Sequence, residues 1–139
     1  MKKYGFLALV FVILLASCSP SFFGGSYEIS DFPMRPNELW SVAFRIGANR
    51  METGFSLKYT PFVDRDGDVV AELIVSSKLS KGLAYIDNAD GTFVLRFVGN
   101  GLVWVCRAPM GSDWEVVGGE GYVSDGRNEV EGQCAFGRG

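Results

Sequence analysis

Apolar and polar residues alternate along most of the chain from position 40 onward. In residues 40–46, Trp, Val, Phe and Ile occupy every second position. Successive side chains of a β-strand point to opposite faces, so a period of two predicts half-buried strands. The same period recurs in four further segments: residues 55–59, 93–97, 102–106 and 130–136.

Asx-Gly pairs separate several of these segments and predict hairpin turns. The pairs are Asp66-Gly67, Asp90-Gly91, Asn100-Gly101 and Asp125-Gly126. Such a pair can supply the two residues with positive φ that a type I′ turn requires. The third pair is the clearest, because it joins residues 93–98 directly to residues 102–107. We therefore predict an all-β fold, an antiparallel meander of about eight strands that forms a small barrel or sandwich.

The N-terminus has a different pattern. Two lysines precede an uninterrupted apolar run over residues 6–16, which leads into the sequence Leu15-Ala16-Ser17-Cys18. A spanning helix needs about 20 apolar residues, so this run is too short to cross a bilayer and is typical of a signal peptide. The four-residue motif resembles the lipobox of bacterial lipoproteins, in which an aliphatic residue and two small residues precede a cysteine that carries lipid.

The resemblance implies that residues 1–17 are removed and that the Cys18 thiol receives a diacylglyceryl group. Residues 18–26 would then form a short tether, and residues 27–139 a single all-β domain. Each buried methylene contributes about 0.8 kcal/mol, so the lipid chains would hold the protein at a membrane. Ser19 follows the cysteine where an Asp would favour the inner membrane. In a cell with two membranes we therefore expect the outer membrane, facing the periplasm. An ordinary secretory signal is the alternative.

The cysteine and charge content limits the classes of partner that we expect for this protein. With Cys18 lipidated, Cys106 and Cys134 remain as a pair in an exported protein, which predicts a disulfide. The alternative, a catalytic or metal-binding thiol pair, lacks both CxxC spacing and a histidine. The formal net charge is −3 at pH 7, and the cations are scattered without a basic run. We expect contact with a membrane through the lipid and with an envelope protein, and no binding to nucleic acid.

The chain contains no histidine, which excludes Ser-His-Asp and Cys-His nucleophile systems and the usual zinc ligand sets. No glycine-rich phosphate loop follows a strand and opens a helix. Residues 64–68 (DRDGD) begin like a calcium loop, but Val69 stands where that loop needs glycine and Val75 where it needs glutamate. We interpret residues 64–68 as a hairpin turn, and expect no enzyme activity, no cofactor and no metal.

Three residues are candidates for contact with a partner. Trp114 lies between two acidic residues in a loop-like segment, so we expect it to be the most exposed tryptophan. Residues 80–85 (SKGLAY) resemble the Ser-Gly…Tyr inhibitory loop of periplasmic lysozyme inhibitors, which are small lipoproteins with a disulfide and an antiparallel barrel. That resemblance makes Ser80 and Tyr85 candidates. The glycine-rich residues 118–121 (GGEG) are interpreted as a bulge or bend, in preference to a ligand-binding loop.

These observations favour a lipid-anchored, non-catalytic envelope protein that acts as a protein-binding or scaffolding module. The alternatives are a lysozyme-type enzyme inhibitor, a small barrel that binds an apolar ligand and, last, a carboxylate hydrolase. Each predicts a different structure. A binding module needs an exposed apolar patch or a free strand edge, and an inhibitor needs an exposed rigid loop at residues 80–85. A carrier needs an open apolar cavity, and a hydrolase needs two converging carboxylates.

Overall fold

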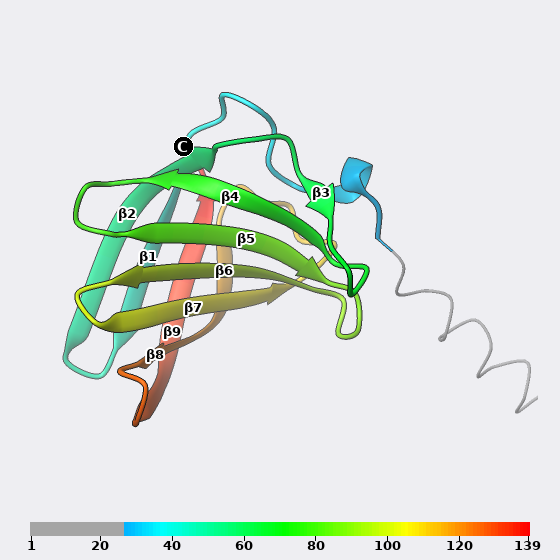
Figure 1. The fold of residues 1–139 in the computed structure, drawn as a ribbon. Helices are drawn as coiled ribbons and strands as arrows, with labels where there is room; N and C mark the ends of the chain where they lie inside the picture. Colours follow the sequence, from blue (N-terminus) through cyan, green and yellow to red (C-terminus); the bar gives the residue numbers. More distant parts are fainter. Residues whose placement is uncertain (1–26) are drawn as a thin grey trace, which may run out of the picture.

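The computed structural model describes residues 27–139, which form a closed antiparallel barrel of eight strands (Figure 1). Consecutive strands pair along the chain, and pairing of β2 with β4 and of β1 with β9 closes the barrel. The prediction of an antiparallel meander of about eight strands is confirmed, and the fold is a barrel. The elements are η1 (Ile29–Asp31), β1 (Trp40–Ile46), β2 (Asn49–Leu57), β3 (Phe62–Val63), β4 (Val69–Val75), β5 (Lys81–Asp87), β6 (Thr92–Gly99), β7 (Leu102–Pro109), β8 (Val117–Ser124) and β9 (Glu129–Arg138).

The predicted signal peptide, Cys18 and the tether lie outside the described residues. Short β3 pairs only with the start of β4, so it is an addition to the eight-stranded wall. Figure 1 shows that β1, β2 and β9 cross the direction of β4–β7 steeply.

The barrel has two ends, which its antiparallel strands connect. At one end Tyr27 enters the fold and donates its backbone N–H to Asn88 Oδ1, at a distance of 2.7 Å. We call this the Tyr27 end. It also carries η1, β3, the connections β5–β6 and β7–β8, and the last residues of β9. The opposite end carries the turns β1–β2, β4–β5, β6–β7 and β8–β9.

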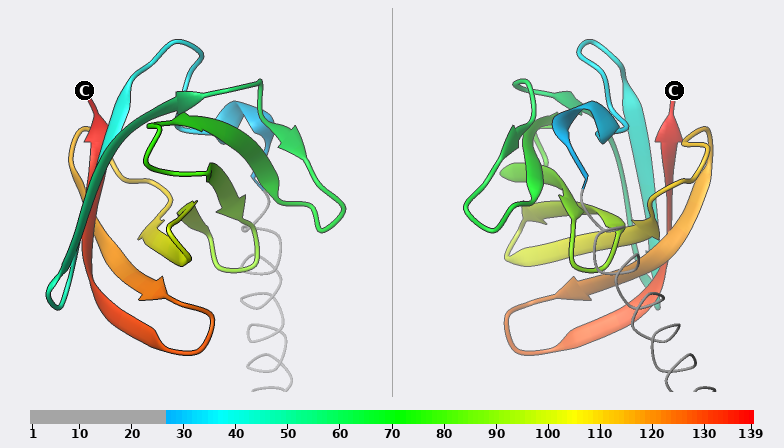
Figure 2. Two further views of the ribbon diagram at one scale, coloured as in Figure 1. Left: turned by 60° about the vertical axis from the view of Figure 1, so that its left-hand side comes forward. Right: turned by 90° about the vertical axis from the view of Figure 1, so that its right-hand side faces the viewer.

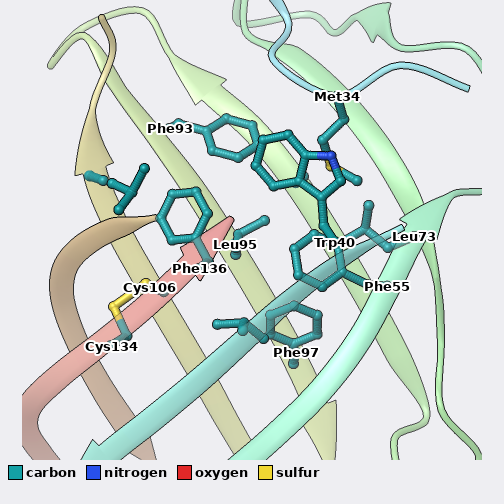
Figure 3. Close-up of a cluster of buried hydrophobic side chains, with 14 of the residues drawn as sticks. Met34, Trp40, Phe55, Leu73, Phe93, Leu95, Phe97, Cys106, Cys134 and Phe136 are labelled. Carbon is teal, nitrogen blue, oxygen red and sulfur yellow. A yellow bond between two sulfur atoms is a disulfide. The ribbon is translucent and has the colours of Figure 1, made fainter. Parts of the chain in front are cut away.

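Aromatic side chains fill the barrel interior (Figure 3). Rings from different strands meet there: Phe55 and Phe97 at a centroid separation of 5.5 Å, and Trp40 and Phe136 at 6.3 Å. Phe32, in the segment after η1, packs edge-on against Phe93 at 5.4 Å and closes the Tyr27 end. The interior is therefore a packed core.

The predicted disulfide is present between Cys106 on β7 and Cys134 on β9, with a Cα–Cα distance of 5.9 Å. These strands are not neighbours, because β8 runs between them. In the register, Cys106 lies opposite Gly121 and Cys134 lies opposite Gly119. The bridge thus crosses the inner face of β8 where that strand has no side chains. Pairing of β8 with β9 is unbroken over 117–124, so of the predicted bulge or bend the bulge is absent.

All four Asx-Gly pairs lie in turns, but only one is a type I′ pair. Asn100 and Gly101 have φ values of 52° and 75° and connect β6 directly to β7. In the other three turns only the glycine has positive φ, so a type I′ turn is the wrong prediction there. Those loops are four or five residues long, a length usually built around a type I turn. A single residue with left-handed backbone conformation is then enough to reverse the direction of the chain.

Candidate functional site: an apolar outer face

The outer surface of β4–β8 carries apolar side chains where an antiparallel sheet would normally meet water. On β6, Phe93, Leu95 and Phe97 point inward, so the alternate residues point outward. The same parity applies to the neighbouring strands. We call the resulting set the outer face. It comprises Val70, Leu83, Tyr85, Val94, Arg96, Val98, Val103, Val105, Arg107 and Tyr122. Other outward positions of the same strands are polar or charged, among them Glu72, Lys81, Asp87, Glu120 and Ser124.

Strand register brings these side chains into two adjacent rows. One row runs Val70, Tyr85, Val94, Arg107, and the other runs Leu83, Arg96, Val105, Tyr122. Directly opposite residues in such a ladder have Cβ atoms about 4.5–5.5 Å apart, so each row is continuous.

Two valines at the centre of the outer face are inaccessible to solvent although they point away from the core. Val94 is 0% exposed and Val105 is 3% exposed. Larger residues flank them in the register, including Tyr85 beside Val94 and Tyr122 beside Val105. We infer that these neighbours cover the valines. The outer face is therefore a second, small apolar layer on the outside of the barrel.

The outer surface of β9, β1 and β2 is different. Outward positions there are small, polar or charged, as at Ser41, Arg45, Glu131 and Gln133. One antiparallel wall thus has the usual apolar-in, polar-out pattern, whereas the wall of β4–β8 is apolar inside and also has an apolar centre on its outer side. The sequence carries a signal for this that the alternation argument missed: residues 93–98 and 102–106 are apolar at nearly every position.

The charges on the outer face are unequal. The Arg107 guanidinium lies 3.6 Å from Asp87 and 3.4 Å from Asp90, so two carboxylates compensate it. Arg96 is exposed, and within residues 27–139 it forms no ion pair. Burial raises the pKa of the Tyr85 phenol, and the Arg107 cation partly opposes this rise. The outer face therefore offers one uncompensated cation among apolar groups and a tyrosine that stays neutral.

A hollow of about 690 Å³ adjoins the outer face beside Arg107. Pairing of β7 with β8 ends at Arg107 and Glu120, and the hollow opens beyond that point. Gly118 lines it, and a Cβ atom added there would meet no heavy atom within 4 Å. The φ of Gly118 is not left-handed, so neither backbone conformation nor packing in the described residues requires a glycine here. A side chain of another molecule could occupy this space.

The two residues of the inhibitor-like segment do not form a loop. Tyr85 lies on the outer face in the middle of β5, whereas Ser80 precedes that strand at the opposite end of the barrel. The Ser80 hydroxyl donates to the Val98 carbonyl at 2.9 Å. Five residues of extended chain separate the two side chains by about 16 Å. β5 is paired on both sides, so the exposed rigid loop expected of an inhibitor is absent.

Trp114 is the most exposed of the three tryptophans, as predicted, but it is only half-exposed and packs against the core. Its indole packs against Phe93 at 5.3 Å, Phe136 at 6.0 Å and Trp40 at 6.3 Å. Its φ of 64° turns the side chain toward the core, although its acidic neighbours are exposed. Two residues later, Val116 is 81% exposed. Local polarity predicted the loop and the relative exposure of Trp114 correctly, but it did not indicate that the indole packs against the rings of the core.

The acidic segment 64–68 is a hairpin turn, as predicted. The Asp64 carboxylate accepts backbone N–H groups from Asp66 and Asp68, each at 3.0 Å, and Asp68 accepts the N–H of Asn88 at 3.1 Å. Within residues 27–139, no group of three or more His, Cys, Asp or Glu side chains could hold a metal ion. In the same residues, no helix has the length and apolar character needed to cross a membrane.

Comparison with protein-family models, curated proteins and solved structures finds no match for this chain. The functional argument therefore depends on the geometry of the outer face itself.

Proposed function

We propose that this protein is a lipid-anchored, non-catalytic module of the cell envelope that binds another envelope protein through the outer face. The observation that carries the proposal is the apolar layer around Val94 and Val105, on the outside of a barrel whose other wall is polar. The two valines themselves are buried, but Tyr85 and Tyr122, which flank them, are only half-buried, and contiguous accessible apolar surface of this kind is often a site of interaction. Lipidation of Cys18 would supply the attachment to the membrane.

The size of the outer face suits the centre of a protein interface. The ten side chains of the outer face lie on five strands spaced about 4.8 Å apart, with at most three on one strand, so they span at most roughly 20 Å by 15 Å, on the order of 300 Å². Contiguous apolar patches on single-chain proteins reach about 300–600 Å² and are often functional. A stable interface buries about 800 Å² on each partner, so the outer face would form its apolar core within a polar rim.

The charges define the chemistry of the partner. Because Arg96 has no ion pair in the described residues, the partner should present an apolar surface with a carboxylate that meets its guanidinium. The hollow beside Gly118 can accept a protruding side chain of that partner.

The alternatives have less support. A carrier of apolar ligands needs an open interior, and aromatic rings fill the interior of this barrel. An inhibitor similar to the lysozyme inhibitors needs a loop at residues 80–85, most of which belong to a paired strand.

The test is cross-linking of the tagged, lipidated protein in its native envelope, followed by mass spectrometry. We expect one dominant partner with the wild-type protein and loss of that partner with Arg96→Glu. Reversal of a charge that is buried and paired in an interface costs about 2–5 kcal/mol, which corresponds to at least a tenfold loss of affinity. The matched control is Arg45→Glu, the same charge change on the polar wall, which should retain the partner. Equal capture by both variants, or recovery of the protein alone, would contradict the proposal.

A further inference from the structure

Large exposed apolar side chains gather at the Tyr27 end of the barrel. In residues 27–139, eight such side chains are 43–81% exposed. Two of them, Ile74 on β4 and Val130 on β9, lie elsewhere. The other six form what we call the apolar rim: Ile29, Leu39, Tyr59, Phe62, Val63 and Val116.

The rim residues come from distant parts of the sequence, and the topology brings them to one end. Ile29 lies in η1, and Leu39 immediately precedes β1. Tyr59 follows β2, the strand β3 is Phe62–Val63, and Val116 immediately precedes β8. Ile29 in η1 and the two residues of β3 lie at the Tyr27 end together with the strand entries and exits at Leu39, Tyr59 and Val116. Figures 1 and 2 show η1 and β3 together at this end, beside the point where the described chain begins.

Packing of the barrel core does not explain why the rim residues are apolar. Phe32 and Met34 close this end of the barrel and are each 1% exposed, whereas Val116 is 81% exposed and Leu39 is 63% exposed. Exposed single apolar residues are common, but six of eight at one end of a small barrel form a concentration that points to a surface.

The predicted lipid anchor is attached to the same end. Tyr27 is held there through Asn88, and it lies nine positions after Cys18 in the sequence. A chain of nine residues reaches at most about 30 Å. A lipid on Cys18 would therefore hold the Tyr27 end within about 30 Å of the bilayer surface, so this end is the part of the barrel attached nearest to the membrane.

We propose that the apolar rim lies in the interfacial layer of the membrane, so that the anchored barrel stands on its Tyr27 end. The inference rests on the proposed lipid anchor and deepens it by giving the barrel a fixed orientation. Tyrosine and aliphatic side chains suit this layer, where one part of a residue is apolar and another is hydrated. The Nζ atom of Lys58 lies 5.3 Å from the centroid of the Tyr59 ring and 3.5 Å from Glu72, so the cation beside this ring is already compensated by a carboxylate and fits a layer without net charge.

The charge at the Tyr27 end indicates which lipid headgroups this end can approach. The exposed residues there include Asp66, Asp90, Asp113 and Glu115, and the cations beside them are fewer. An anionic headgroup layer would repel this end, whereas a zwitterionic layer would not. The surface that fits the rim is therefore a bilayer of zwitterionic phospholipid.

The experiment places one fluorescent label on the lipidated full-length mature protein. The variants Val63→Cys and Val116→Cys carry it on the rim, and Val130→Cys carries it at the opposite end as the matched control, with a similarly exposed valine. Vesicles of phosphatidylcholine contain lipids with a quencher in the acyl chains. We expect several-fold stronger quenching and a blue-shifted emission for the two rim labels, and neither for the control. Replacement of half of the lipid by phosphatidylglycerol should reduce quenching of the rim labels.

Flotation with the vesicles, measured on the same samples, separates the two proposals. Protein that floats while its rim labels remain unquenched would overturn the rim inference and leave the anchor intact. Protein that does not float, with Cys18 present, would overturn the anchor and the rim inference together. Rim labels that are shielded only after addition of envelope proteins would assign the rim to a protein partner and would also overturn the inference.

Discussion

Two adjacent glycines on β8, Gly118 and Gly119, should respond in opposite ways to the same substitution. In Gly119→Ala the new Cβ would lie 2.5 Å from the Arg107 carbonyl oxygen and 3.1 Å from the Cys134 sulfur. Both distances are shorter than the roughly 3.5 Å at which nonbonded heavy atoms pack. The carbonyl belongs to a paired strand, so relief requires movement of β7 or β8 and not rotation of a side chain. In Gly118→Ala the new Cβ would meet nothing within 4 Å.

The magnitudes follow from these contacts. Overpacking against a backbone that cannot retreat costs about 2–3 kcal/mol of the free energy of unfolding. Ala at an unstrained position restricts the unfolded chain and stabilises by about 0.5 kcal/mol. The two variants should therefore differ by about 3 kcal/mol. At about 4 °C per kcal/mol for a domain of this size, that is roughly 12 °C in Tm.

The assay is urea unfolding of the oxidised protein, followed by tryptophan fluorescence, with the m-value compared between variants. Gly119→Ala should lower the midpoint and Gly118→Ala should leave it unchanged or raise it. If Gly119→Ala yields no folded protein while Gly118→Ala does, Gly118→Ala is still the more stable variant, as expected. Equal midpoints for the two variants would refute the crossing of the disulfide over β8.

Three further results are expected. Reduction of Cys106–Cys134, which are 28 residues apart, should lower the free energy of unfolding by about 3–4 kcal/mol, as urea unfolding with and without reductant would show. Asn100→Ala should cost about 1 kcal/mol because φ is 52° there, whereas Asn100→Gly should be nearly neutral in the same assay. The backbone N–H of Asn128 lowers the pKa of Asp125. The stabilisation that the Asp125 carboxylate provides should therefore be complete above its unfolded pKa of about 4. It should be lost as the pH falls through the lower pKa of Asp125 in the folded protein. The stability difference between wild type and Asp125→Asn should disappear in acid, and a pH-independent difference would contradict this.

Much of the fold could be predicted from local pattern. The alternation in residues 40–46 and 93–97 placed the inward-facing side chains correctly, because parity along a strand is a property of neighbouring residues. Asn100-Gly101 predicted a two-residue turn, since two residues with positive φ determine that turn by themselves. The pairing of Cys106 with Cys134 followed once Cys18 was assigned to lipid.

The candidate site could be predicted only in part. Tyr85 was chosen for its place in a short resemblance, and the structure places it on the outer face with an environment that the resemblance did not imply. Trp114 was correctly predicted from its acidic neighbours to be the most exposed tryptophan, but its contacts with the core were not predicted. Local polarity describes the backbone of a loop, but the direction of a side chain depends on what the loop covers.

The sequence by itself determined the strands, one tight turn, the disulfide and the resemblance of the N-terminus to a lipoprotein signal. Only the tertiary structure decided that β2 pairs with β4 and closes the barrel, and that the apolar outward residues of β4–β8 form one layer. It also brought Leu39, Phe62 and Val116 to a single end. The reason is that strand parity depends on residues next to each other in the chain. A shared surface, in contrast, depends on the register between strands and on barrel closure, which join residues far apart in sequence.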